Sequence, residues 1–181
     1  MRYFTLREAR EAASSGFRTA KSVLSEEARE FKSYKSYDIF LSHSFSDADL
    51  VLGAKKLLER GGFTVYVDWI EDPHLDRSRV TKETAQHIKE RMHSCRRLVY
   101  ATSENSKDSK WMPWELGYFD GHKPGEVAIL PLMESERADF KGQEYLSLYP
   151  ILRKDGASSY SGSGIELYDG RFAKTYSRIA A

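Results

Sequence analysis

Apolar and polar residues follow two different patterns along this chain, and the change between them falls near residue 35. Up to residue 32, apolar side chains recur three, four and seven residues apart with Arg, Glu and Lys between them, which predicts an amphipathic helix over residues 5–32. Its apolar stripe is narrow and rich in alanine, so the helix needs a partner. Two interpretations stay open: it packs on its own domain, or on a second copy of itself.

From Tyr37 onward, short apolar runs alternate with helical stretches, which is typical of βαβ units and a parallel sheet. Strands are expected over residues 38–41, 63–67, 98–101, 127–132 and 148–152. Helices are expected between the first strand and Gly61-Gly62, over about residues 80–93, from residues 109–112 to Gly121, and from about Arg171 to the end. The third of these helices must begin near residues 109–112, because a proline, here Pro113, is accepted only in a first helical turn.

These elements predict an α/β, flavodoxin-like fold, with a five-stranded parallel sheet in the order 2-1-3-4-5 flanked by helices. We expect two parts, an N-terminal helical extension over residues 1–34 and one domain over residues 35–181. A chain of 181 residues is long enough for a single core of this kind.

Charge and composition exclude several partners and compartments. With 28 Lys and Arg against 27 Asp and Glu, the net charge of +1 gives no drive for binding nucleic acid or an anionic membrane. The chain starts without an apolar signal region and has no run of about 18 apolar residues, so we expect a cytoplasmic protein. Its one cysteine, Cys95, cannot form an internal disulfide and is expected to be a buried thiol.

Sheets of this order bind ligands outside the carboxyl ends of the strands, where the strand order reverses. That point lies between the first and third strands, so it selects the loops at residues 42–47 and 102–109 and the start of the helix that follows. Both loops are rich in hydroxyl groups, which also serve as ordinary turn and helix-capping groups.

The segment Trp111-Met112-Pro113-Trp114-Glu115 is the most specific local feature. In a helix, Trp111 and Glu115 are four residues apart and adjacent on one face, which sets an apolar wall beside a carboxylate. In the alternative interpretation the tryptophans are core residues, and Glu115 only complements the positive end of the helix dipole.

Metal binding is not expected. His74 and Asp76 lie in the long loop after the second strand and His87 lies in the helix that follows, but no two of them have the spacing of metal ligands. His43 is interpreted as a loop residue, with ligand contact as the alternative.

Three motifs resemble Toll/interleukin-1 receptor (TIR) domains. Residues 37–44 (Tyr-Asp-Ile-Phe-Leu-Ser-His-Ser) are similar to the first TIR box, residues 68–79 to the BB loop, and Trp111 with Glu115 to the Trp-x-x-x-Glu of the catalytic helix. The resemblance covers about residues 35–155, and the three motifs occur in the family's order.

The resemblance implies an enzyme that cleaves NAD+ at the nicotinamide–ribose bond, with NAD+ as substrate and no cofactor. Glu115 is the implied catalytic residue. Together with the strand-end geometry, the resemblance assigns substrate contacts to Ser44, Phe45, Asp68, Trp69, Ser103 and Trp111. It assigns an assembly loop, for contacts between TIR domains, to Asp72, Pro73 and Leu75.

The product and the partners follow from the same resemblance. Water as acceptor gives ADP-ribose, and attack by a ring atom of the same adenine gives a cyclic ADP-ribose. Compact bacterial TIR proteins resemble the signal-producing component of Thoeris-type antiphage systems, whose nucleotide product activates a separate effector protein.

Three rival functions share this fold. A non-catalytic TIR scaffold that acts by assembly is the main alternative, and blockage of the pocket by the loop at residues 68–79 would favour it. A response-regulator receiver is excluded because Ser42-His43-Ser44 and Thr102-Ser103 stand where acidic residues are needed. A nucleoside deoxyribosyltransferase does not match the first-strand motif.

Overall fold

The computed structural model describes residues 2–14, 36–44, 47–73, 75, 77, 80–154, 164–170 and 173–175. The strands are β1 (Phe4–Thr5), β2 (Tyr37–Ser42), β3 (Val65–Tyr66), β4 (Cys95–Thr102), β5 (Val127–Met133), β6 (Ile151–Lys154), β7 (Ile165–Tyr168) and β8 (Ala173–Thr175). The α-helices are α1 (Leu6–Ser14), α3 (Ala48–Arg60), α4 (Asp68–Glu71), α5 (Lys82–Ser94) and α6 (Trp111–His122), and two 3-10 helices are η2 (Glu104–Asp108) and η3 (Glu144–Leu148).

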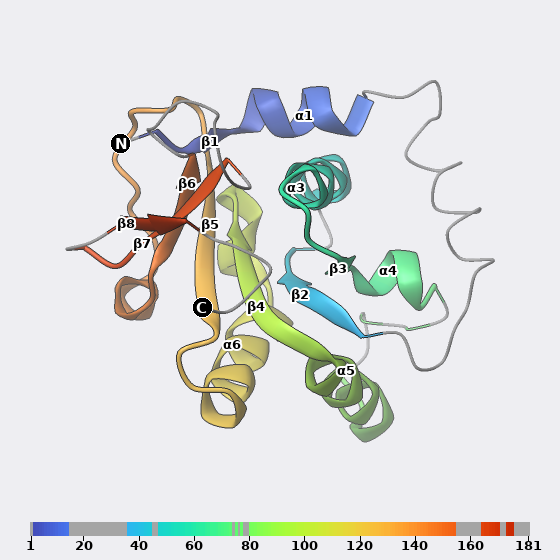
Figure 1. The fold of residues 1–181 in the computed structure, drawn as a ribbon. Coiled ribbons are helices and arrows are strands. Elements are labelled where there is room, and N and C mark those ends of the chain that lie inside the picture. The colour runs from blue at the N-terminus through green and yellow to red at the C-terminus, as the bar shows by residue number, and fades with distance from the viewer. Residues whose placement is uncertain are drawn as a thin grey trace.

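The five strands expected from the sequence are β2, β3, β4, β5 and β6. They lie in the order β3-β2-β4-β5-β6 and all pair in parallel, which confirms the predicted order 2-1-3-4-5 (Figure 1). The order reverses between β2 and β4, so the carboxyl ends of these two strands mark the expected site.

The sheet continues past β6, which corrects the expectation of five parallel strands. β7 pairs antiparallel with β6, and β8 pairs antiparallel with β7. The helix expected from Arg171 is wrong over Ala173–Thr175, where the chain forms β8. Residues 169–172 connect the two strands, and Gly170 has a φ of 93°, the positive value that favours glycine. The rest of that expected helix lies outside the described residues.

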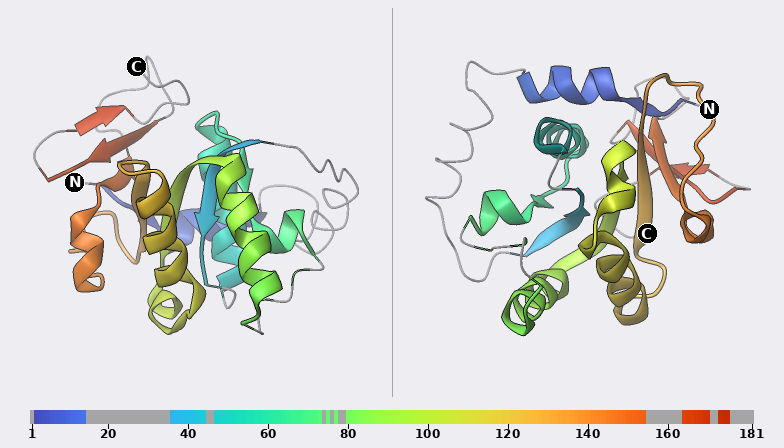
Figure 2. Two further views of the ribbon diagram at one scale, coloured as in Figure 1. Left: turned by 90° about the horizontal axis from the view of Figure 1, so that it is seen from below. Right: turned by 180° about the vertical axis from the view of Figure 1, so that it is seen from behind.

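Alternate residues of the central strands enter two separate cores. On β2, Ile39 and Leu41 join the core under α1 and α3, whereas Phe40 joins the core under α5 and α6. This is the period-two pattern of a strand buried on both faces. Figure 2 shows α5 and α6 lying side by side on one face of the sheet, opposite α1 and α3.

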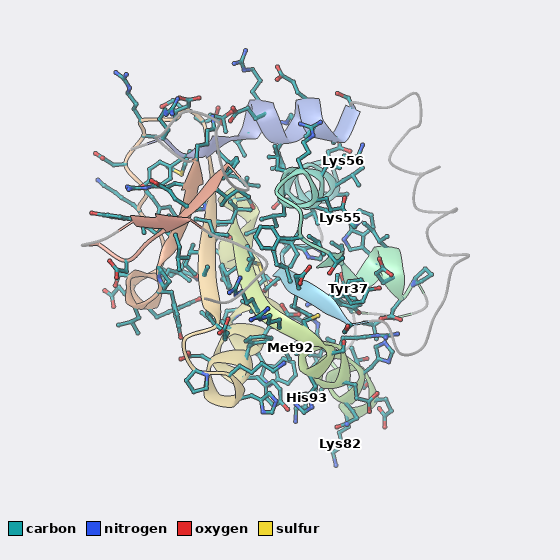
Figure 3. The ribbon with its side chains drawn as sticks, viewed as in Figure 1. Tyr37, Lys55, Lys56, Lys82, Met92 and His93 are labelled. Carbon is teal, nitrogen blue, oxygen red and sulfur yellow. The ribbon has the colours of Figure 1, made fainter. Side chains whose placement is uncertain are left out.

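The described part of the N-terminal extension packs on its own domain. β1 pairs in parallel with β5, and α1 crosses α3 so closely that a Cβ on Gly53 would lie 1.9 Å from the Ala9 carbonyl oxygen. Lys56 rises from α3 toward α1 and donates to the Ala13 carbonyl oxygen at 2.9 Å (Figure 3). Of the two interpretations, packing on the domain therefore holds for α1. Residues 15–35 lie outside the described residues, so the boundary at residue 34 stays a prediction.

The helices of the opposite face begin where their sequences favour a start. Thr81 caps α5, because its hydroxyl accepts a hydrogen bond from the Thr84 amide at 3.1 Å. α6 begins at Trp111, which places Pro113 in the first turn as expected. Met92, labelled in Figure 3, points from α5 into the core, and Cys95 is 1% exposed. No helix within the described ranges is long and apolar enough to span a membrane.

Candidate active site

Glu115 lies in α6 at the carboxyl ends of β2 and β4, and its side chain is fully buried. Ser42, the last residue of β2, is also fully buried and donates a hydrogen bond from Oγ to Glu115 Oε2 at 2.6 Å. The strand end and the helix start therefore meet at the point where the strand order reverses. A carboxylate placed here is oriented by protein groups before any substrate arrives.

Arg77 joins Glu115 to a second buried acid, Asp68. Its Nη2 donates to Glu115 Oε1, and its Nη1 donates to Asp68 Oδ2 at 2.5 Å. The Arg77 side chain is 12% exposed, and those of Asp68 and Glu115 are 2% and 0% exposed. Two carboxylates this deeply buried need a positive partner, and Arg77 supplies it.

The electrostatics agree with this pairing. Burial lowers the pKa of Arg77, but Glu115 and Asp68 together raise it above its usual range. Burial raises the pKa of Asp68, but the His43 and Arg77 side chains lower it by more, so its pKa lies well below the usual range. His43 contributes to this lowering only as a cation.

His43 is held in the neutral form by two hydrogen bonds. Its Nδ1 lies 2.7 Å from the Leu41 carbonyl oxygen, which can only accept, so Nδ1 carries the proton. Its Nε2 accepts from Trp69 Nε1 at 2.7 Å, because an indole nitrogen can only donate. Nε2 therefore has no proton for Asp68 Oδ1, which lies 3.3 Å away. Arg77 is then the cation that keeps Asp68 ionised, and Asp68 Oδ1 has no hydrogen-bond donor among the described residues.

Trp111 forms one wall of this cluster. It is 8% exposed, and its Nε1 donates to the Arg77 carbonyl oxygen at 2.8 Å. The Arg77 guanidinium carbon lies 5.8 Å from the centroid of the Trp111 ring, within the range of a cation–π interaction. Trp111 and Glu115 thus contact the same side chain from neighbouring turns of α6.

The hydroxyl residues assigned to substrate lie in the two adjoining loops. Ser44 is 7% exposed and accepts a backbone hydrogen bond from Asp47. Ser103 donates from its hydroxyl to the Asp47 carboxylate, and it lines a cavity of about 730 Å³ between the ends of β4 and β5. Phe45 lies outside the described residues. The structure therefore brings Asp68, Trp69, Trp111 and Glu115 into one cluster, directly or through Arg77 and His43. Ser44 directly follows His43 in the chain, whereas Ser103 contacts Asp47 and lines a cavity that no residue of the cluster lines.

The residues assigned to the assembly loop have different environments. Asp72 is 6% exposed, and its carboxylate accepts from the Tyr66 hydroxyl at 2.6 Å and from two Arg91 nitrogens at 2.7 and 2.6 Å. These contacts fix the end of α4 against α5 within the chain. Pro73 is exposed, and Leu75 is partly buried against the core under α5 and α6.

The sequence patterns do not single out Arg77, and they place Ser42 and His43 in a loop at the site, with ligand contact as an alternative for His43 alone. A signal for Arg77 was present, because a buried glutamate requires a cation. Searching the strand-end loops for a cation would have found the two arginines, Arg77 and Arg79, in the loop after the second strand. Nothing in the sequence indicates the pairing of the His43 ring with Trp69.

Comparison with known proteins adds an independent line of evidence. A family model described as "TIR domain" matches residues 39–158. A protein of Bacillus cereus (strain MSX-D12), named "Probable 3' cyclic ADP-D-ribose synthase ThsB'", is 57% identical over 136 residues, which are 75% of this chain and 70% of that protein. A protein of Cytobacillus dafuensis, named "Putative cyclic ADP-D-ribose synthase TIR2", is 30% identical over 93 residues, which are 51% of this chain and 24% of that protein. The matched region contains the whole Ser42, Asp68, Arg77, Trp111 and Glu115 cluster, and the chain belongs to the TIR domain family.

Proposed function

We propose that this protein cleaves the bond between nicotinamide and ribose in NAD+ and joins the ADP-ribose part into a cyclic ADP-ribose, a signal in bacterial antiphage defence of the Thoeris type. The buried Glu115, fixed by Ser42 and walled by Trp111, is the observation that carries the proposal. The names of the two relatives support this product class, and that of the first points to the 3′ cyclic form.

The chemistry requires few protein groups. When the bond between C1′ and the ring nitrogen breaks, its electron pair passes to nicotinamide, which leaves as a neutral molecule. Positive charge then develops at C1′, and a carboxylate beside it stabilises that charge more in the transition state than in the ground state. Glu115 fills this role, and a hydroxyl of the adenosine ribose then attacks C1′ and loses its proton.

Substrate contacts are assigned to Asp68, Trp69, Trp111, Ser44 and Ser103, and to Phe45 outside the described residues. We assign self-association of TIR domains to the loop of Asp72, Pro73 and Leu75, in which Asp72 fixes the loop to α5 and Pro73 is exposed. The cyclic product would act on a separate effector protein that senses it.

A non-catalytic TIR scaffold is the second candidate, and one observation favours it. Arg77, from the loop after β3, pairs with Glu115 and takes up the carboxylate oxygen that would face substrate. A pure scaffold, however, has no need for two buried carboxylates at the end of its strands, since a buried ion pair is weak in stabilising a fold.

Incubation of the full chain with NAD+, followed by mass spectrometry of the nucleotides, tests the proposal. We expect a cyclic product from the wild type and from Glu126→Gln, which changes a surface glutamate, and none from Glu115→Gln. Equal turnover by wild type and Glu115→Gln overturns the role of Glu115. Absence of both turnover and NAD+ binding in wild type and in Arg77→Gln supports the scaffold.

A further inference from the structure

The two buried carboxylates at this site share one positive group. Asp68 and Glu115 are contributed by α4 and α6, and both bind the same guanidinium. If Arg77 left, two buried like charges would remain together without a positive partner, which is strongly unfavourable. Whatever replaces Arg77 here must therefore bring its own positive charge.

The shape of the site also restricts its occupant. A guanidinium is planar and its charge is delocalised. It lies within 5.8 Å of the Trp111 ring centroid, and an indole ring favours a cation over its face. The nicotinamide ring of NAD+ has the same properties, because it is planar and carries a delocalised positive charge until its bond to ribose breaks.

One acceptor in the site has no donor among the described residues. Asp68 Oδ1 is buried without a hydrogen-bond partner, because the neighbouring His43 Nε2 is occupied by Trp69. An unsatisfied buried carboxylate oxygen costs free energy. The carboxamide of nicotinamide carries an NH2 group, which is a donor of the kind that this oxygen lacks.

We propose that Asp68 and Glu115 form a binding site for a planar cation, which Arg77 fills in the closed site and the nicotinamide ring of NAD+ fills during turnover. Asp68 Oδ1 accepts the carboxamide NH2, so Asp68 is a specificity-determining residue. Arg77 is an internal competitor of the substrate. This inference rests on the proposed function.

Competition between Arg77 and the nicotinamide ring changes in favour of Arg77 as the reaction proceeds. Bond cleavage moves the positive charge from the ring to C1′, where Glu115 stabilises it, and attack by the ribose hydroxyl with loss of its proton then removes it. Once the product has formed, the two carboxylates have therefore lost their positive partner. The Arg77 guanidinium then binds them better than nicotinamide does. Its return favours release of the leaving group and closes the site against another ligand.

Binding of small pyridinium ions tests the site without any turnover. The probes are 1-methylnicotinamide, neutral nicotinamide, and 1-methyl-3-acetylpyridinium, which keeps the charge and loses the NH2 donor. We expect Arg77→Gln to bind 1-methylnicotinamide about tenfold more tightly than wild type. The substitution removes the guanidinium that competes with the probe for the two carboxylates, so a larger fraction of the protein is ready to bind. The acetyl analogue should bind Arg77→Gln more weakly than 1-methylnicotinamide, and adding Asp68→Ala to Arg77→Gln should abolish that difference, because the accepting oxygen is removed.

Matched variants separate this inference from the proposed function. Arg97→Gln removes an arginine that pairs with Glu126 away from the site and should leave binding and KM unchanged. Arg77→Lys keeps a charge without the planar fork and should lie between wild type and Arg77→Gln, and it serves as the test if Arg77→Gln does not fold. The KM for NAD+ should fall about tenfold in Arg77→Gln.

Two patterns of results distinguish failure of the competitor role of Arg77 from failure of the proposed function. Turnover that requires Glu115, with unchanged KM and pyridinium binding in both Arg77 variants, overturns the competitor role and leaves the proposed function standing. Tighter pyridinium binding in Arg77→Gln, with no NAD+ cleavage by any variant, supports the cation site and overturns the proposed function.

Discussion

Ser42 and Glu115 are 73 residues apart in sequence, yet their side chains share a buried hydrogen bond of 2.6 Å. Ser42 is the last residue of β2, and Glu115 lies in the second turn of α6, so the bond fixes the Glu115 carboxylate to the end of a central strand. One oxygen of Glu115 is held by Ser42 and the other by Arg77. Ser42 belongs to the sheet, whereas Arg77 belongs to the segment between α4 and α5.

Ser42→Ala should therefore lower kcat and leave KM less affected. Loss of a hydrogen bond to a buried charged group costs about 1.5–3 kcal/mol, which corresponds to a loss of roughly tenfold or more if the bond orients Glu115 in the transition state. Steady-state kinetics with NAD+ measure both constants. Ser147→Ala, which changes an exposed serine of η3, is the control and should match wild type. An unchanged kcat in Ser42→Ala would show that Glu115 is oriented without this bond.

The sequence predicted the architecture well because burial leaves a periodic trace in it. Strands buried on both faces appear as short apolar runs, and the strand order followed from the alternation with helices. The hairpin of β7 and β8 was missed although Asp169-Gly170 is a hairpin turn signal, because each of its strands is too short to show a period.

The site was predictable only where its chemistry is local. Trp111 and Glu115 are neighbours on one helix, so their proximity can be inferred from spacing. Arg77 is 38 residues from Glu115, and only the tertiary fold brings the two together. The TIR resemblance pointed to the loop that contains Arg77, but it assigned that loop to assembly and substrate contacts and not to a charge within it.

Gly53→Ala should detach or displace α1. Alanine favours a helix over glycine by about 1 kcal/mol, but the new Cβ would overlap backbone atoms of Ala9, which cannot move aside as a flexible side chain can. We expect a net loss of about 2 kcal/mol or more in the free energy of unfolding, measured in urea. Cleavage by protease between α1 and β2 should also become faster.

Gly121→Ala is the matched control for that substitution. Gly121 lies in α6, and a Cβ there would meet no atom within 4 Å. We expect it to raise the free energy of unfolding by about 0.5–1 kcal/mol. If both variants shift stability in the same direction, the close crossing of α1 and α3 is not the cause of the Gly53 effect.

Asp72→Asn should weaken the fold by about 2–4 kcal/mol at neutral pH, because Arg91 would lose a buried bidentate partner. Burial raises the pKa of Asp72, but hydrogen bonds from Arg91 and Tyr66 lower the pKa by a larger amount. The pKa of Asp72 therefore lies below its usual value. The folded state then binds fewer protons than the unfolded state, and the contribution of Asp72 is complete above about pH 4 and is lost as the pH falls below it.

Urea unfolding from pH 3 to pH 7 measures this pH dependence. The difference in stability between wild type and Asp72→Asn should be constant from pH 5 to 7 and should shrink toward pH 3. Glu126→Gln removes the partner of Arg97 at the surface and should cost less than about 1 kcal/mol. A difference for Asp72→Asn that grows on acidification would contradict the assigned ionisation.

The tautomer of His43 shows directly whether Asp68 Oδ1 receives a hydrogen bond from His43. If Trp69 donates to Nε2 and Nδ1 donates to the Leu41 carbonyl oxygen, the ring is neutral with its proton on Nδ1. Nitrogen-15 NMR of the labelled imidazole at pH 7.5 should then show a protonated Nδ1 and an unprotonated Nε2.

Trp69→Phe removes the indole donor and leaves the ring free to place a proton on Nε2, toward Asp68 Oδ1 at 3.3 Å. The Nε2-protonated form should appear in that variant, and the discrimination between 1-methylnicotinamide and its acetyl analogue should weaken, because Oδ1 would have gained a donor within the protein. Finding the proton on Nε2 in the wild type would mean that Asp68 is already satisfied and does not need the substrate's carboxamide.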